Sequence, residues 1–259
     1  MPSSTGDAQA VTAVTLLTPT SGSVVGGTTL TISGSGLTKV TGVTVGGQPA
    51  ADLTLVDDTT VTVTTPPAAD YQPASVEVVV SGGDGVAPVG TGSFSYEVMT
   101  GVDAQMQYAF AHWNDYNVAE YGNLNPVGGD CANFVSQTLI ARGWQQSAQW
   151  YNRGAGADWS STWGYAPAMD DWFASDTSLG LTRLTLEQRD QVKVGDVGFF
   201  DWNDNGTPDH VMLVSRVSVV DGVTKLAFVS HNLDGDYRDL DNVITVEHPG
   251  GTAWFYSIP

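Results

Sequence analysis

Cysteine and histidine are the residue types in this chain that could act together in nucleophilic catalysis. Cys131 is the only cysteine among the 259 residues, and His210 and His231 follow it along the chain. A cysteine nucleophile needs a base, usually a histidine, and a third polar group that fixes the tautomer of that base. The alternative is that a lone cysteine is a small buried hydrophobic residue.

The stretch GGDCANFVSQTLIARG, residues 128–143, predicts a helix that begins at Cys131. Asp130 is of a type favoured at the N-cap, and Gly143 is suited to end the helix. Cys131 would then lie in the first turn, where the positive end of the helix dipole and free N–H groups favour a thiolate. Its own N–H would supply one oxyanion donor.

The two histidines lie at the ends of two predicted strands. His210 opens the apolar run HVMLVS, and His231 closes the strand KLAFVSHN. A short connection makes antiparallel neighbours of these strands, so we expect His210 and His231 to lie close together. A cysteine, a histidine and a polar residue on the next strand follow the order of a catalytic triad.

The elements that must position these residues belong to the second of two halves. Residues 11–98 lack Trp, Cys and His, and short β-branched runs alternate with glycine turns, which predicts an antiparallel sandwich. Residues 103–259 carry all eight tryptophans and all four histidines. They begin with helical patterns, including a predicted helix over residues 103–122, and end in strands, which indicates an α+β domain.

Each half resembles a known family. The stretches LTPTSGSVVGGTTLTISGSGL, VTVGGQPA and GSFSYE resemble an IPT/TIG domain. GDC, NFVSQ, FFDWNDNGTPDHVMLV and VSHN resemble the bacterial putative amidase domain, a relative of papain-like NlpC/P60 and CHAP cysteine hydrolases. The resemblance implies an all-β immunoglobulin-like sandwich at residues 11–98, followed by an α+β papain-like cysteine hydrolase domain at residues 103–259.

The resemblance also implies roles for individual residues. Cys131 is the expected nucleophile, and His210 is the expected base and later acid. His231 is the expected orienter of His210, with Asn232 as its rival; neighbours on a strand point to opposite faces, so only one of them can serve. The supporting candidates are Asp209 and Asp130. The expected reaction is hydrolysis of an amide bond, with peptidoglycan or a peptide as the substrate.

Other functions use the same residues. An acyl transferase, of the transpeptidase or transglutaminase kind, would pass the acyl group from Cys131 to an amine. A protein that only binds cell wall or glycan would not use Cys131 chemically. The aromatic candidates for a substrate cleft are Trp159, Trp163 and Trp202. The first half is expected to be a spacer or a binding module, and His112 and His248 are expected to be packing or loop residues.

No cofactor is expected, although one loop partly follows a calcium-binding pattern. Its oxygen-bearing side chains are Asp201, Asn203, Asn205 and Asp209. Met212 stands where such a loop carries a bidentate glutamate, so a solvated turn is the competing interpretation. A zinc site formed by Cys131, His210 and His231 is a further alternative.

Charge and hydropathy exclude some partners. With 28 acidic and 9 basic residues, the net charge of −19 disfavours nucleic acid and anionic lipid. No apolar run reaches the roughly 18 residues of a membrane span. Residues 1–10 lack the features of a signal peptide. We expect a monomeric bacterial protein that is secreted or cell wall-associated, with its signal peptide absent from this chain.

Overall fold

The computed structural model describes residues 13–82 and 89–259, which form two compact units that divide after Met99. The signal-peptide expectation falls on residues 1–10, and the first two residues of the predicted domain at 11–98 also lie outside the described residues. In the described part, no helix is long and apolar enough to cross a membrane.

The first unit is a sandwich of two sheets, with strand orders β1-β3-β7-β6 and β2-β9-β8-β4-β5. Its elements are β1 (Ala13–Thr18), β2 (Ser21–Ser23), β3 (Thr29–Ser35), η1 (Leu37–Lys39), β4 (Val40–Val45), β5 (Gln48–Pro49), β6 (Ala51–Asp57), β7 (Thr60–Thr64), η2 (Ala69–Tyr71), β8 (Ala74–Gly82) and β9 (Val89–Glu97).

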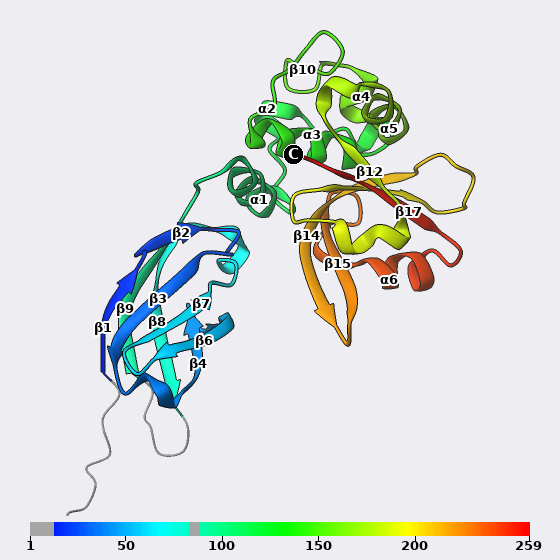
Figure 1. Ribbon diagram of the computed structural model, residues 1–259. Coiled ribbons are helices and arrows are strands. Elements are labelled where there is room, and N and C mark those ends of the chain that lie inside the picture. The colour runs from blue at the N-terminus through cyan, green and yellow to red at the C-terminus, as the bar shows by residue number, and fades with distance from the viewer. Residues whose placement is uncertain (1–12, 83–88) are drawn as a thin grey trace, which may run out of the picture. The chain divides into compact units, whose positions relative to one another are not determined.

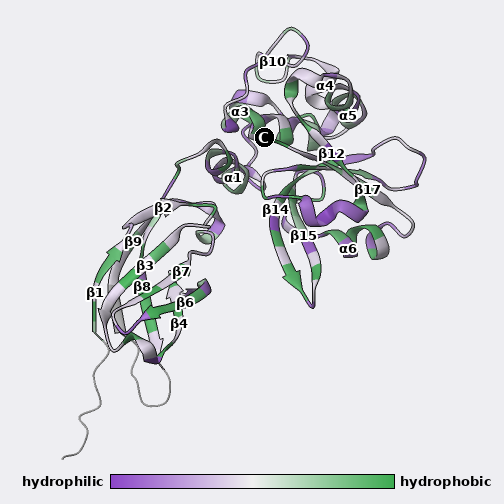
Figure 2. Ribbon diagram, in the orientation of Figure 1, coloured by the Kyte–Doolittle hydropathy of each residue, from purple (hydrophilic) through white to green (hydrophobic). Residues whose placement is uncertain are grey.

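Alternating apolar residues form the core between these sheets. Leu30 and Ile32 of β3 pack in one cluster with Val78 and Val80 of β8, which lies in the opposite sheet. Successive side chains of a strand point to opposite faces, so alternation every second residue buries one face of each sheet. Figure 2 shows these alternating colours along the strands. The predicted β-rich, immunoglobulin-like first half is confirmed.

The second unit combines helices with one six-stranded sheet. Its helical elements are α1 (Gly101–His112), α2 (Val118–Tyr121), η3 (Asn125–Val127), α3 (Cys131–Arg142), α4 (Ser161–Gly164), α5 (Ala166–Ser175), η4 (Thr177–Leu179), η5 (Leu186–Gln191), α6 (Leu240–Asn242) and η6 (Val243–Glu247). Its strands are β10 (Asn152–Arg153), β11 (Asp158–Trp159), β12 (Thr182–Leu184), β13 (Val197–Asp201), β14 (His210–Val220), β15 (Val223–Ser230), β16 (Gly235–Asp239) and β17 (Thr252–Ser257).

The six-stranded sheet, in the order β12-β17-β13-β14-β15-β16, is covered on both faces. Figure 1 shows α3, α4 and α5 on one side and α6 on the other. On the first side, Phe173 of α5 contacts Phe199 and Tyr256 of the sheet. On the other side, Phe200 and Phe255 pack in a core with residues of η5, α6 and η6. This two-sided burial explains why the central strands are apolar almost throughout.

The first helix is shorter than the predicted helix over residues 103–122. Thr100 is the N-cap of α1, and Asp103 completes a capping box with it instead of capping the helix itself. The helix ends at His112, and α2 forms a separate turn before Gly122. The break matters because it frees the carbonyl of His112, which reappears in the candidate site.

Arg142, at the end of α3, joins three distant segments of the second unit. Its guanidinium donates to Gln105 Oε1 of α1 at 2.8 Å and to the carbonyl oxygens of Ile258 and Pro259 at 3.2 and 3.0 Å. Burial lowers the pKa of Arg142, although Asp196 nearby opposes this. The planar guanidinium group has several N–H donors in fixed directions, so it can bind these acceptors together better than the ammonium group of a lysine would.

Replacing this guanidinium tests the junction. Arg142→Met removes a donor shared by Gln105 Oε1 and the carbonyl oxygens of Ile258 and Pro259, of which that of Pro259 is exposed, so we expect the free energy of unfolding of the second unit to fall by about 1–3 kcal/mol. Denaturant titration of the full chain by tryptophan fluorescence reports on this unit, because all eight tryptophans lie within it. Arg153→Met is the matched control, since Arg153 is exposed and its contact with Asp158 is 3.8 Å. Equal effects of the two substitutions would contradict the junction role.

Candidate active site

Helix α3 begins at Cys131 and is followed by Gly143, as the sequence predicts. Gly143 adopts φ 113°, a conformation that glycine accepts without strain. Asp130 occupies the N-cap position, but its carboxylate makes no capping hydrogen bond to the first turn of the helix. The predicted helix is therefore present, while the predicted use of Asp130 as a capping side chain is wrong.

A pocket of about 460 Å³ opens over Cys131. It is lined by three segments that lie far apart in the sequence: residues 127–131, 159–167 and 207–209. Gly128 and Gly129 reach φ 133° and 134°, so the chain turns sharply into α3 at a point where glycine is favoured. The pocket thus exposes Cys131 from one side at the end of a helix.

Burial governs the acidity of the Cys131 thiol. It raises the pKa to about 11, although hydrogen bonds from the backbone N–H groups of Val211, Ala132 and Cys131 itself lower it. The negative charge of Asp130 raises the pKa further. The sequence predicts a thiolate at this helix end, whereas desolvation outweighs the N–H groups and keeps the thiol protonated at neutral pH.

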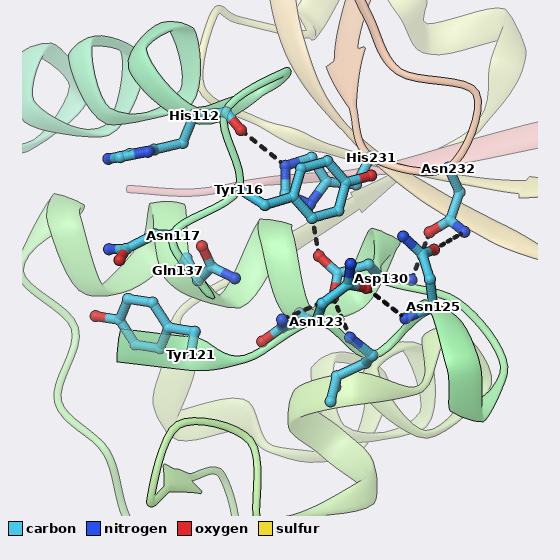
Figure 3. A network of polar contacts seen from close by, with 12 residues as sticks. His112, Tyr116, Asn117, Tyr121, Asn123, Asn125, Asp130, Gln137, His231 and Asn232 are labelled. Carbon is cyan, nitrogen blue, oxygen red and sulfur yellow. Dashed lines mark hydrogen bonds and ion pairs between the residues drawn. The ribbon is translucent and has the colours of Figure 1, made fainter. Parts of the chain in front are cut away.

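The carboxylate of Asp130 is instead the centre of a buried network, shown in Figure 3. Oδ2 lies 2.5 Å from Nδ1 of His231, and Oδ1 accepts from the Leu124 N–H at 2.7 Å and from Asn133 Nδ2 at 2.9 Å. Asp130 and His231 are both wholly buried. This network links the loop before α3 to the end of β15.

His231 is held on every side and does not contact His210. Its Nε2 lies 2.9 Å from the carbonyl oxygen of His112. Its ring is stacked between Tyr116, at 3.5 Å between ring centres, and Phe134, at 4.2 Å. Both ring nitrogens are occupied, so the prediction that His231 orients His210 does not fit these contacts.

Asn232, the rival orienter, is also engaged elsewhere. Its Oδ1 accepts from the backbone N–H of Asp130, and its Nδ2 donates to Asn125 Oδ1, both at 2.5 Å. The amide therefore holds the entry to α3 and does not approach His210. Asn232 itself adopts a left-handed conformation, φ 62°, which asparagine tolerates better than most residues.

His210 begins β14 as predicted, but its side chain lies on the face of the sheet away from α3. It pairs across the sheet with Phe200, which belongs to the core under α6. Cross-strand partners share a face. Its ring lies 5.8 Å from that of Trp202. The expected Cys131–His210 contact is therefore not formed in this arrangement.

The strand register explains why the two histidines diverge. β14 and β15 are antiparallel neighbours, as predicted, and Leu213 pairs with Val229. Phe228 belongs to the core under α6, so its neighbour Val229 turns to the opposite face with Leu213. His231, two residues on, contacts Phe134 of α3, whereas His210 shares a face with Phe200. An offset of one residue moves a side chain to the other face of a sheet. His231 thus lies on the α3 face, and His210 does not.

Burial lowers the pKa of His210 to about 3, with further lowering by the charges of Arg238 and His248. The ring is therefore neutral at neutral pH. Its Nε2 is buried and has no hydrogen-bond partner among the described residues. A buried polar atom without a partner is costly, typically by about 1–3 kcal/mol. The unpaired Nε2 thus makes the buried position of His210 energetically unfavourable.

Of the three candidate cleft tryptophans, the structure brings only Trp159 to the pocket. Trp163 is buried and donates through Nε1 to Asn133 Oδ1 at 2.7 Å, so it builds the core beneath α3. Trp202 stacks on His248 at 3.9 Å, beside His210 on the far face. His112 contributes its carbonyl oxygen to the network around His231.

In the loop at residues 201–209, side-chain oxygens accept hydrogen bonds from backbone N–H groups of the same loop. Asp201 accepts from the N–H groups of Asn203 and Gly206, and Asn205 accepts from Thr207 N–H at 2.9 Å. Asp209 lines the pocket, and its Oδ2 accepts from the Trp202 N–H at 2.8 Å. Within the described ranges, no three His, Cys, Asp or Glu residues come together as a metal site would require. The calcium and zinc alternatives therefore stay predictions.

Sequence reasoning missed the pocket wall formed by Tyr165 and Pro167. Tyr165 precedes α5, and Pro167 lies in its first turn. Proline is common at the start of helices, so this start was detectable. Tyr116, which stacks on His231, had no comparable signal, because stacking depends on a contact across more than a hundred residues.

A helix-borne cysteine at the base of a pocket, on a mixed α/β domain, is an arrangement that suits a hydrolase. Comparison with known families agrees. The putative amidase domain family matches residues 101–256, and the IPT/TIG domain matches residues 13–96. The chain belongs to the putative amidase domain family and carries an IPT/TIG domain ahead of that domain. Family membership supports a hydrolase-type activity.

Individual relatives add little beyond this. The uncharacterized protein YhbB of Bacillus subtilis (strain 168) is 31% identical over 127 residues, which cover 47% of this chain and 38% of that protein. The Plexin A4 extracellular region is similar over 34% of this chain and 9% of its own, at 23% identity and a TM-score of 0.30. An auxiliary nutrient binding protein from Bacteroides ovatus is similar over 35% of this chain and 20% of its own, at 26% identity and a TM-score of 0.22.

The pH dependence of Cys131 alkylation tests whether the thiol is protonated at neutral pH. With a pKa of about 11, the rate of alkylation by iodoacetamide should rise about tenfold for each pH unit between about pH 7 and pH 10. Only one cysteine is present, so mass spectrometry of the intact chain follows the reaction without ambiguity. A short peptide with a free cysteine serves as the reference. A plateau near neutral pH would reveal a thiolate paired with an imidazolium and would contradict the assignment.

The buried neutral His210 makes stability depend on pH. The unfolded chain takes up a proton near pH 6.5, whereas the native His210 does so only near pH 3. Between these values the unfolded state binds more protons, so the free energy of unfolding falls as pH falls, by about 1.4 kcal/mol per unit at most. Denaturant titrations at several pH values in this range should show that the free energy of unfolding falls more steeply with falling pH in wild type than in His210→Gln. Parallel curves would show that His210 is not the group responsible.

Proposed function

We propose that this protein is a secreted, monomeric, cysteine-dependent amide hydrolase of the papain-like NlpC/P60 and CHAP kind, acting on peptidoglycan or a related peptide. The observation that carries the proposal is the placement of Cys131. It lies at the start of α3 and at the base of a pocket, with backbone N–H groups directed at its sulfur. Membership of the putative amidase domain family supports the reaction class.

In the proposed mechanism, the deprotonated sulfur of Cys131 attacks the amide carbonyl. A carbon–sulfur bond forms, and the carbonyl oxygen becomes an oxyanion. Backbone N–H groups of the first turn, those of Cys131 and Ala132, are the donors available to it. His210, the proposed base, takes the proton of the thiol and gives it to the amine as the carbon–nitrogen bond breaks; water later hydrolyses the thioester, which releases the carboxylic acid and restores the thiol.

His210 is our proposed base, acting after a change of position. It is the first residue of β14 and follows an exposed loop, so a change confined to the start of the strand, where His210 pairs with Phe200, would bring its side chain to the α3 face. The backbone N–H of the next residue, Val211, is among the groups that lower the pKa of the Cys131 thiol. The unpartnered Nε2 favours such a move, because the present position leaves it without a hydrogen bond.

The pocket lining bears on the substrate. Trp159, Tyr165 and Pro167 offer apolar and aromatic surface, which suits a sugar ring or an apolar side chain. Asp209 is the one charged side chain of the lining, and no lysine or arginine belongs to it. We therefore propose a substrate that is neutral or cationic next to the scissile bond.

One observation favours a second function, that of a non-catalytic binder of wall or glycan. The thiol is protonated at neutral pH, and His210 is turned away from it. A protein that only held its ligand in this pocket would need neither a thiolate nor a base. The first unit would then be a further binding module or a spacer.

Removal of the sulfur separates the two functions. Cys131→Ala should lower amide hydrolysis by at least about 10³-fold while ligand binding persists, because only the covalent step is lost. The assay is digestion of purified peptidoglycan, with released muropeptides analysed by mass spectrometry. Arg153→Met, at an exposed position, is the control. Equal product formation by Cys131→Ala and wild type would rule out the cysteine mechanism, and binding without product in wild type would favour the non-catalytic function.

A further inference from the structure

Asp130 stands at the N-cap of α3 but does not act as a cap. An aspartate at this position usually accepts from the N–H groups of the second or third helical residue. Here the carboxylate turns away, toward the Leu124 N–H, Asn133 Nδ2 and His231 Nδ1. The side chain of Asp130 therefore leaves the N–H groups of the first turn uncapped, and those of Cys131 and Ala132 lower the pKa of the Cys131 thiol.

His231 is the partner that stabilises this orientation of the Asp130 carboxylate. Its Nδ1 faces a carboxylate oxygen and its Nε2 faces the carbonyl oxygen of His112, and both of these are acceptors. A neutral imidazole has only one N–H, so both contacts are satisfied only when the ring carries two protons and a positive charge. Figure 3 shows this ring beneath Tyr116, aligned with Asp130.

The charge of His231 matters for Cys131 because Asp130 precedes it directly. The negative charge of Asp130 opposes a thiolate on the neighbouring residue. A doubly protonated His231 ring, with Nδ1 2.5 Å from the carboxylate, would offset that charge. Without the cation, the carboxylate would find its nearest donors in the first turn of α3, and it would compete with the Cys131 sulfur for their N–H groups.

We infer that His231 is a positioning residue, which holds the Asp130 carboxylate away from the first turn of α3 and so keeps the N–H groups there directed at Cys131. The inference rests on the proposed role of Cys131 as the nucleophile. It differs from a triad role, because His231 acts through Asp130 and not through His210.

A simpler alternative is that His231 is a buried strut. It joins the end of α1 to the start of α3 through His112 and Asp130, and it fills the space between Tyr116 and Phe134. A strut would affect stability and would leave the acidity of Cys131 unchanged. Thiol reactivity therefore separates the two roles.

The experiment compares three variants of the full chain. His231→Phe keeps an aromatic ring between Tyr116 and Phe134 but removes both N–H donors and the charge. His231→Asn places a neutral amide near the position of Nδ1, within reach of Asp130. The double variant Asp130→Asn/His231→Phe also removes the negative charge. The measurement is the rate of alkylation of Cys131 by iodoacetamide as a function of pH.

We expect His231→Phe to alkylate about tenfold more slowly than wild type at a given pH, which corresponds to one unit of pKa. The alkylation rate of His231→Asn should lie between those of wild type and His231→Phe. The double variant should recover at least half of the loss on a logarithmic scale, because the carboxylate that blocks the first turn is gone. If His231→Phe does not fold, His231→Asn with and without Asp130→Asn carries the same comparison.

Ser136→Ala is the matched control for stability. Ser136 is buried within α3, and its hydrogen bonds run to the carbonyl oxygen of Trp163 at 2.8 Å and from Trp150 Nε1 at 3.0 Å instead of to Asp130 or His231. A His231 variant that reacts at the same rate as Ser136→Ala would overturn the inference, and so would a double variant no faster than the single one. Because alkylation needs no substrate, these outcomes stay distinct from a failure to find amide hydrolysis.

Discussion

The buried ion pair between Asp130 and His231 is the contact on which the arrangement around Cys131 depends. Removing two charges from water costs several kcal/mol for each ion, and their attraction offsets this only when the remaining hydrogen-bonding groups are also satisfied. Both carboxylate oxygens and both ring nitrogens have partners here. Leu124, Asn133 and His112 therefore have to be in place together, so the loop before α3, the end of α1 and the end of β15 form one cooperative assembly.

The second constraint is the alternation of side chains along β14 and β15. His231 reaches Asp130 because it lies on the face of the sheet that α3 covers, and the register then sends His210 to the other face. A sheet cannot direct both residues to α3 without an irregularity in one strand. The contact that organises the helix thus keeps the expected base away from the nucleophile. In the mechanism that we propose, activation of Cys131 by His210 requires a local change at the start of β14.

Much of the fold could be predicted from the sequence, because it follows from local patterns. The short β-branched runs between glycine turns predicted a sandwich, and Val78 and Val80 of one such run are buried between its two sheets. Asp130, Cys131 and Gly143 predicted the limits of α3, since caps and stops depend on adjacent residues. These features require no knowledge of distant contacts.

The site could be predicted only in part, because its properties depend on contacts between distant segments. Cys131 was identified, but its acidity depends on how fully residues 159–167 and 207–209 bury it, and no local pattern reports that. The pairing of β14 with β15 was predictable, whereas the one-residue offset between His210 and His231 was not. The role of Asp130 was misassigned for the same reason. Its capping tendency is local, and the histidine that overrides it lies 101 residues away.

The protonated state of the Cys131 thiol also protects it against oxidation. Oxidation and disulfide exchange proceed through the thiolate, so a buried cysteine with a pKa of about 11 reacts slowly with oxidants at neutral pH. In the secreted setting that we propose, a reactive cysteine without this protection would be lost to oxidation. The same burial that protects Cys131 raises the cost of forming the nucleophile. The N–H groups left uncapped by Asp130 reduce that cost, because they lower the pKa of the thiol.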